Sequence, residues 1–133
     1  MDFMDLAVTT TSSYGIEKGL DVIGILAGGI HDNRKFQDIF LEAGAEVAAY
    51  EKDNTEECEV RQIIFCKDNM LKLAKGMKKI SGFEWGKQLD IYLDDLLRES
   101  ALTTEQKRSC KIHFVEVIKN EIMYFFGEIY QQN

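Results

Sequence analysis

Residues 36–50 read FQDIFLEAGAEVAAY. The apolar positions of this stretch recur every three or four residues, which is the spacing of one face of an α-helix. They are Phe36, Ile39, Phe40, Ala43, Val47 and Tyr50. Asp32 or Asn33, just upstream, has a side chain suited to capping a helix N-terminus. The sequence therefore predicts an amphipathic helix here, with one buried face.

The stretch upstream of this helix, residues 16–30, also has helical apolar spacing. Its stripe consists of Ile16, Leu20, Ile23, Ala27 and Ile30. A rival interpretation makes residues 22–25 a strand followed by a glycine-rich phosphate turn, in an α/β fold. However, the segment GILAGG lacks the full GxGxxG pattern, and the chain stays in helical register up to Tyr50. We therefore favour the helix.

Downstream, the same spacing continues almost to the C-terminus. It predicts a helix opening at Thr55, a second over residues 69–80 after a break at 67–69, a third from Trp85 and a long last helix behind Thr103. Thr103 and Gln106 have the spacing of a capping box. We expect an all-α protein, a globular bundle of six or seven helices forming a single domain over residues 1–133.

Composition narrows the function classes. The net charge is −7, and residues 1–60 contain 13 acidic residues against 4 basic ones, which argues against a nucleic-acid surface. The lysines at 72, 75, 78 and 79 are expected to form a solvated helix face. No apolar run approaches the roughly 20 residues of a membrane-spanning helix. We expect a soluble cytoplasmic protein without a membrane-spanning anchor, and with reduced thiols.

Motifs of catalysis are missing, since the chain has no P-loop, HExxH or GxSxG pattern. Glu56, Glu57 and Glu59 suit a helix N-terminus, where carboxylates are favoured. A metal-dependent nucleotide hydrolase, one alternative, would need a second acidic pair facing them, for which Asp94 and Asp95 are the candidates. We expect no catalytic residue, no metal site and no cofactor.

The most informative motif is GFEWGK, residues 82–87. Trp85 can anchor a helix start by burying a large area. Gly86 removes a side chain where another backbone could approach, and Lys87 places a charge beside that approach. A buried tryptophan followed by a tolerated glycine is the simpler interpretation of the same residues.

In this motif the chain resembles the Bcl family of apoptosis regulators, whose first homology motif reads Asn-Trp-Gly-Arg at the start of a central helix. A second match is FLEAGAEV, residues 40–47, which resembles the family's third homology motif. The resemblance covers roughly residues 36–125 and implies a Bcl-like helical bundle around a central helix. With no evident anchor or long loop, the chain is similar to the family members encoded by large DNA viruses.

The departures from the family pattern refine what the resemblance implies. Lys87 stands where the family has arginine, so an ion pair with a partner's aspartate would lack the bidentate geometry. Ala45 replaces the aspartate of the third motif, so the chain is expected to receive such helices and not to donate one. The acidic residues at 90, 94 and 95 make a membrane pore doubtful.

The resemblance therefore implies a viral inhibitor of apoptosis that sequesters pro-apoptotic proteins in the host cytoplasm and meets mitochondria only through them. Their amphipathic Bcl-homology-three helix would lie in a hydrophobic groove between the 36–50 helix, the 69–80 helix and the start of the Trp85 helix. The expected binding residues are Val47, Tyr50, Leu73, Met77, Trp85, Gly86, Lys87 and Leu89. An exposed groove also favours a homodimer. A helical adaptor domain of another family, such as an innate-immune module, is the other alternative.

Overall fold

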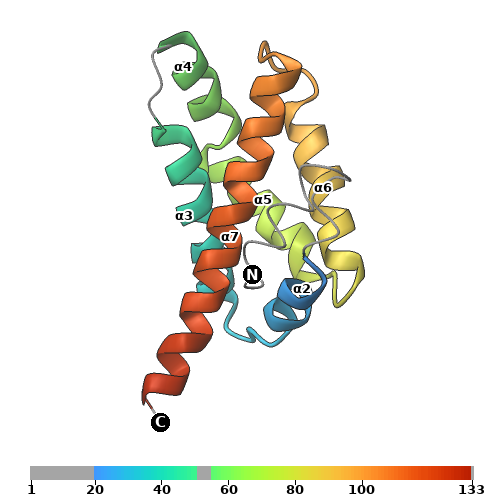
Figure 1. Cartoon of the computed structure of the whole chain (residues 1–133), viewed down its shortest axis with the longest axis vertical. Coiled ribbons are helices and arrows are strands. Elements are labelled where there is room, and N and C mark those ends of the chain that lie inside the picture. Colours follow the sequence, from blue (N-terminus) through green and yellow to red (C-terminus); the bar gives the residue numbers. More distant parts are fainter. Residues whose placement is uncertain (1–19, 51–54, 133) are drawn as a thin grey trace, which may run out of the picture.

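The structure is a computed structural model and describes residues 20–50 and 55–132. Within these residues the chain forms six α-helices and no strand. In chain order they are α2 (Asp21–Gly28), α3 (Asn33–Ala49), α4 (Thr55–Ile64), α5 (Lys67–Lys78), α6 (Glu84–Leu97) and α7 (Thr104–Gln132) (Figure 1). The predicted all-helical bundle is confirmed. The rival strand at residues 22–25 is wrong, because these residues lie in α2.

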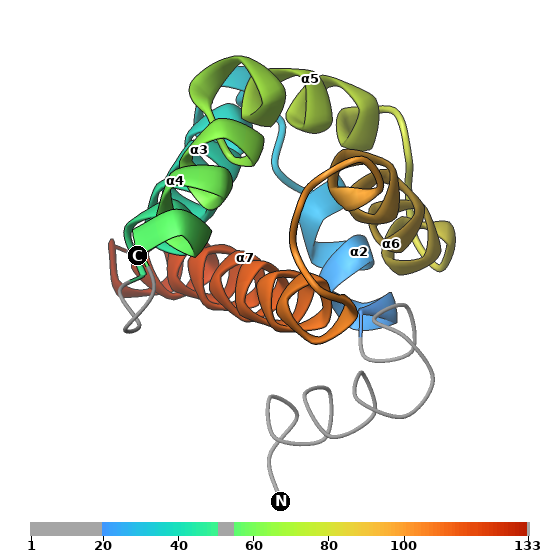
Figure 2. The same cartoon turned by 90° about the horizontal axis from the view of Figure 1, so that it is seen from above.

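The six helices surround one shared core (Figure 2). The longest helix, α7, packs along α3, and α3 packs in turn against α5 and α4. On the other side of the core, α6 contacts α2, α5 and α7. Helices α3 and α7 therefore form the frame of the bundle, and the shorter helices complete its walls.

Aromatic side chains at the centre of the core join these helices. The ring of Phe40 in α3 lies 6.3 Å from that of Trp85 in α6 and 6.2 Å from that of Phe114 in α7, measured between centroids. Phe65, just after α4, stacks on Phe114 at 5.7 Å. Tilted and edge-on aromatic pairs each add about 0.5–1.5 kcal/mol beyond their buried area. A single cluster thus fixes α3, α6, α7 and the turn after α4 to one another.

Two glycines let pairs of helices approach closely. A Cβ atom on Gly24 of α2 would lie 2.3 Å from the carbonyl oxygen of Gly82 and 2.6 Å from Cβ of Trp85. A Cβ atom on Gly44 of α3 would lie 2.5 Å from Cγ of Met70 in α5. Since real Cβ atoms do not come so close to other atoms, α2 can reach α6, and α3 can reach α5, only because these residues are glycine.

The helix ends follow the capping rules read from the sequence. The carboxylate of Asp32 accepts hydrogen bonds from the backbone N–H groups of Arg34 and Lys35, as an N-cap does. Thr103 and Gln106 bond each other's backbone N–H with their side chains at 3.1 and 2.9 Å, which confirms the predicted capping box. The break between α4 and α5 lies at residues 65–66, just before the predicted position.

The resemblance led us to expect that the helix starting near Trp85 is the central helix of the bundle. In the structure this helix, α6, lies at the side of the bundle (Figure 2). Its buried residues form a single stripe, Trp85, Gly86, Leu89, Leu93 and Leu97. Its opposite face is exposed and carries charged residues. A helix surrounded on all sides would be apolar on all faces, so the acidic residues of α6 fit its position at the edge.

Candidate functional site

A mainly apolar cleft of about 350 Å³ lies between α5 and α6. We name it the α5–α6 cleft; it is lined by Asn69, Lys72, Leu73, Gly76, Tyr92, Asp95 and Leu96. Gly76 brings the two helices together here, because a Cβ atom at this position would lie 3.2 Å from the ring of Tyr92. Small-molecule sites and helix-binding grooves are concave and mostly apolar, with few polar groups. This cleft has that character.

One lysine, Lys72, lines the α5–α6 cleft. Lys72, Lys75 and Lys79 are exposed and follow one another at spacings of three and four residues along α5, so they share one helix face. Asp95 on the opposite wall is paired with Arg98 at 2.6 Å. Lys72 is therefore the charge in the cleft that has no ion-pair partner among the described residues. Lys72 thus places a positive charge at this edge of the cleft, although the whole chain is acidic.

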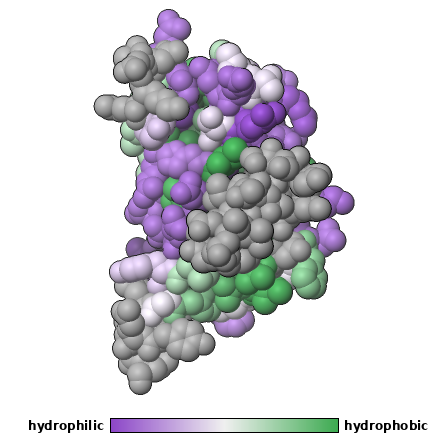
Figure 3. Space-filling view, in the orientation of Figure 1, coloured by the Kyte–Doolittle hydropathy of each residue, from purple (hydrophilic) through white to green (hydrophobic). Residues whose placement is uncertain are grey.

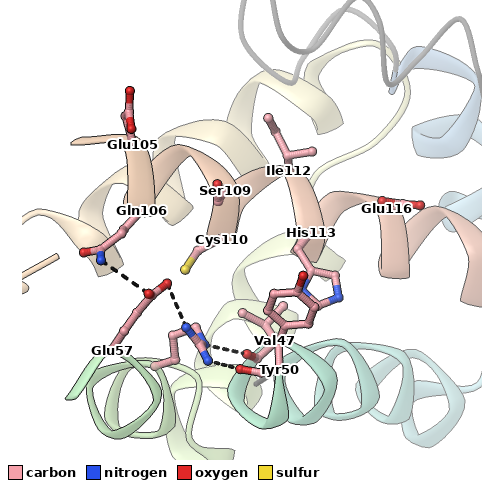
Figure 4. A pocket seen from close by; sticks show the side chains of 11 residues that line it. Val47, Tyr50, Glu57, Glu105, Gln106, Ser109, Cys110, Ile112, His113 and Glu116 are labelled. Carbon is pink, nitrogen blue, oxygen red and sulfur yellow. Dashed lines mark hydrogen bonds and ion pairs between the residues drawn. The ribbon is translucent and has the colours of Figure 1, made fainter. Parts of the chain in front are cut away.

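A second cavity, of about 570 Å³, lies where α7 passes α4 and the end of α3 (Figure 4). We name it the α7 pocket; it is lined by Val47, Tyr50, Glu57, Arg61, Glu105, Gln106, Ser109, Cys110, Ile112, His113 and Glu116. It shares no lining residue with the α5–α6 cleft. The two cavities are thus separate candidates for binding.

The floor of the α7 pocket is an ordered polar network around Arg61, which is buried. Its Nη1 atom lies 2.8 Å from a carboxylate oxygen of Glu57, whose other oxygen accepts a hydrogen bond from Gln106. The guanidinium also donates to the carbonyl oxygens of Val47 and Tyr50, at the end of α3. The carbonyl oxygen of Val47 also accepts the N–H of Tyr50 at 3.4 Å, and Arg61, from α4, adds a charged donor to this end of α3.

Cys110 and His113 extend this floor along α7 (Figure 4). Burial raises the pKa of the Cys110 thiol from 9.0 to about 11, against an opposing effect of Arg61, so the thiol is protonated at neutral pH and is a poor nucleophile. The His113 ring meets the Tyr50 ring edge-on at 5.2 Å. The pocket therefore offers aromatic and thiol surfaces for contact, and no activated nucleophile.

The structure separates the residues expected to bind a partner helix. Val47 and Tyr50 line the α7 pocket, and Leu73 lines the α5–α6 cleft. The predicted groove between α3 and α5 is closed, because Gly44 brings the two helices into direct contact through Met70. Met77, Trp85 and Leu89 are fully buried in the core, so a ligand cannot touch them in this conformation.

Gly86 and Lys87 lie on different sides of the first turn of α6. Gly86 is buried, so a bulky residue there is expected to disturb the fold itself. Lys87 is exposed and lines neither cavity. It lies one helical turn from Phe83 and from Ile91, which are exposed by 71% and 42%. Lys87 thus has apolar neighbours on the outer face of α6.

Sequence reasoning missed the residues that shape both cavities. Arg61 gave no signal, because its partners are mainly backbone carbonyls from another helix. Tyr92 lies in the helix predicted from Trp85, but nothing in the sequence indicated a cleft beside it. Gly76 does carry a signal, since a glycine inside a helical pattern is unfavourable unless a neighbour comes close.

Three of the five carboxylates considered for a metal site are instead paired with cations. Glu57 bonds Arg61, Asp94 bonds Lys111 at 2.7 Å, and Asp95 bonds Arg98. In the part of the chain that the structure describes, no group of three or more His, Cys, Asp or Glu side chains could hold a metal ion. Glu56 and Glu59 are exposed on α4.

Figure 3 shows a further apolar area, over α2 in the lower part of the molecule. Val22 and Ile25 of α2 are about half exposed.

Among residues 20–50 and 55–132, none of the helices is both long and apolar enough to cross a bilayer. Comparison of the chain with protein-family models, curated proteins and solved structures finds no match.

Proposed function

We propose that this protein binds an amphipathic helix of a partner protein in the α5–α6 cleft. Following the resemblance to the Bcl family, we propose that the partner is a pro-apoptotic protein and the bound segment its Bcl-homology-three helix. Sequestering that helix in the cytoplasm of a host cell would inhibit apoptosis. The observation that supports this best is an apolar cleft between two helices, edged by a lysine that forms no ion pair with any residue that the structure describes.

The chemistry of the cleft suits such a ligand. Leu73, Tyr92 and Leu96 offer apolar surface to the anchor residues of an amphipathic helix. Lys72, with the lysines that continue along α5, would face its acidic residues. Complementary charge at a rim mainly raises the association rate and the selectivity of binding. This role passes to Lys72 because Lys87, the family's equivalent position, does not line the cleft.

The test is a calorimetric titration with a synthetic Bcl-homology-three peptide. The expected result is a micromolar or tighter Kd that is lost when the peptide's main leucine is changed to alanine. Leu96→Glu should weaken binding at least tenfold, because it buries a charge against apolar ligand residues. Ile63→Glu, the same change at an exposed site on α4, is the matched control.

Two lysine variants locate the bound helix. Lys72→Glu should weaken binding roughly fivefold, corresponding to about 1 kcal/mol at an exposed rim, and more at low salt. Lys35→Glu makes the same charge change on α3 and should have little effect. If Lys87→Glu weakens binding and Lys72→Glu does not, the helix lies on the outer face of α6 instead. No binding of the peptide at all would refute the proposed partner.

Self-association stays a prediction. The exposed apolar residues Val22 and Ile25 on α2 are a candidate contact between two copies. Sedimentation velocity at micromolar and at hundred-micromolar protein measures it directly. A constant monomer sedimentation coefficient over this range would contradict it.

A further inference from the structure

We propose that the α7 pocket is a binding site for an organic cation with an apolar or aromatic body, such as an amine or a basic side chain. The cavity of about 570 Å³ falls within the usual size range of small-molecule sites, about 300–1,000 Å³. It lies apart from the α5–α6 cleft, so this inference does not depend on the proposed function.

The floor of the pocket is formed before any ligand arrives. All three kinds of nitrogen on Arg61 are used, in contacts with Glu57 and with the end of α3. A guanidinium held in this way is not available to bind an anion. Its positive charge is also balanced by the carboxylate of Glu57. Binding therefore needs little reorganisation of the floor, which limits the ordering cost.

The remaining charge of the pocket is negative. Glu105 and Glu116 line it, are exposed, and form no ion pair within residues 20–50 and 55–132, although Glu116 also interacts with the buried Lys119 ammonium through its charge. The lining thus carries three carboxylates, those of Glu57, Glu105 and Glu116, against the single guanidinium of Arg61. A cation at this position meets attraction from both, whereas an anion is repelled.

The apolar and aromatic part of the lining defines the body of the ligand. The rings of Tyr50 and His113 meet edge-on and form one wall. The Arg61 guanidinium already lies over the Tyr50 ring, 5.9 Å from its centre, and the face of a tyrosine ring attracts cations. The side chain of Cys110 is 96% buried, points into the space between α7 and α4, and has no hydrogen-bond partner among the described residues (Figure 4). Its thiol is therefore a weak polar group that a ligand in the pocket could contact.

The experiment compares three compounds of one shape and different charge: 4-phenylbutylammonium, 4-phenylbutanol and 4-phenylbutyrate. We expect the cation to bind about tenfold more tightly than the alcohol, and the anion most weakly, by NMR chemical-shift titration of the whole chain. Equal affinity of all three compounds, or preference for the anion, would overturn the proposal. So would the absence of any binding by both the ammonium and the peptide described below.

Variants place the bound cation in the pocket. Glu116→Gln should weaken the ammonium severalfold and leave the alcohol unchanged. Glu99→Gln removes the same charge outside the pocket and should change neither. Equal effects of these two substitutions would refute a local site. Ligand should also slow the labelling of Cys110 by a thiol reagent, with Cys58 and Cys66 as internal controls; an unchanged rate would contradict binding at this floor.

The source of the cation is distinguished in the same assay. The peptide acetyl-Leu-Arg-Leu-amide presents a guanidinium on a protein chain. Tighter binding of this peptide than of the ammonium indicates that a basic segment of a partner protein is the ligand. Tighter binding of the ammonium indicates a free amine. Either result supports the same chemical class.

Discussion

Replacement of Arg61 by methionine tests whether the α3–α4 junction is held by the network on the pocket floor. Methionine has a similar length and keeps the packing of the apolar stem, but it removes every hydrogen bond of the guanidinium. The Arg61 side chain is only 3% exposed, and it contacts Glu57 and two backbone carbonyls of α3. The substitution leaves these buried acceptors without their charged donor.

The expected cost follows from the burial. Removing one partner of a buried ion pair typically costs about 3–5 kcal/mol, because the remaining group stays desolvated. For a domain of this size, a loss of 1 kcal/mol lowers Tm by roughly 4 °C, so Arg61→Met should lower it by roughly 12–20 °C. Urea denaturation followed by circular dichroism gives the free energy of unfolding directly.

The chain contains a matched control in Arg98, which pairs with Asp95 at 2.6 Å but is 69% exposed. Arg98→Met should cost less than about 1 kcal/mol, since exposed pairs contribute little. In a double-mutant cycle, Glu57→Gln should cost less in the Arg61→Met background than in the native protein. Equal destabilisation by Arg61→Met and Arg98→Met would refute this reasoning.

Three further predictions concern single sites. Lys119→Met should raise the free energy of unfolding by about 1–3 kcal/mol, because the Lys119 ammonium is buried without a hydrogen-bond partner in the described part of the chain. A denaturant titration measures this change, and a loss of stability would contradict the prediction. Burial lowers the pKa of Lys111, but its bonds to two aspartates of α6 outweigh burial and hold it above its ordinary value of 10.5. The stability from this raised pKa is present below pH 10.5 and lost as pH rises through the folded-state pKa, so unfolding curves of the native protein and of Lys111→Met should converge above that pH. Gly24→Ala should lower the free energy of unfolding by about 1–3 kcal/mol, because the new Cβ collides with the backbone at Gly82. Gly28→Ala is the control: the new Cβ has no atom of the described residues within 4 Å, so Tm should stay unchanged or rise slightly.

The helices could be predicted from the sequence because their signals are local. The apolar stripe from Phe36 and the capping pair Thr103 and Gln106 depend on spacing within one segment, and spacing is preserved on folding. The exact residue at which each helix begins or ends depends on contacts with side chains outside that helix. The break after α4, for example, is stabilised by Asn69, whose side chain donates to the carbonyl oxygen of Ile64.

The candidate site was harder to predict, because periodicity shows which face of a helix is buried and not what covers it. Met77 and Leu89 have the spacing of groove residues and also of core residues, and the structure places them in the core. Gly44 was interpreted as part of a binding motif, but its role in the fold is to admit α5. The lysine at the cleft was expected to be a solvated residue. Only the tertiary packing shows that Lys72 borders an apolar cleft.

The contact between α3 and α5 links the choice of residue at two distant positions. Gly44 leaves no room for a β-carbon, whereas Met70, which fills the space, has the most adjustable side chain of any apolar residue. A larger residue at 44 is therefore tolerable only together with a shorter one at 70. We expect positions 44 and 70 to covary in related chains. Their combined side-chain volume should be conserved, and not the identity of either residue.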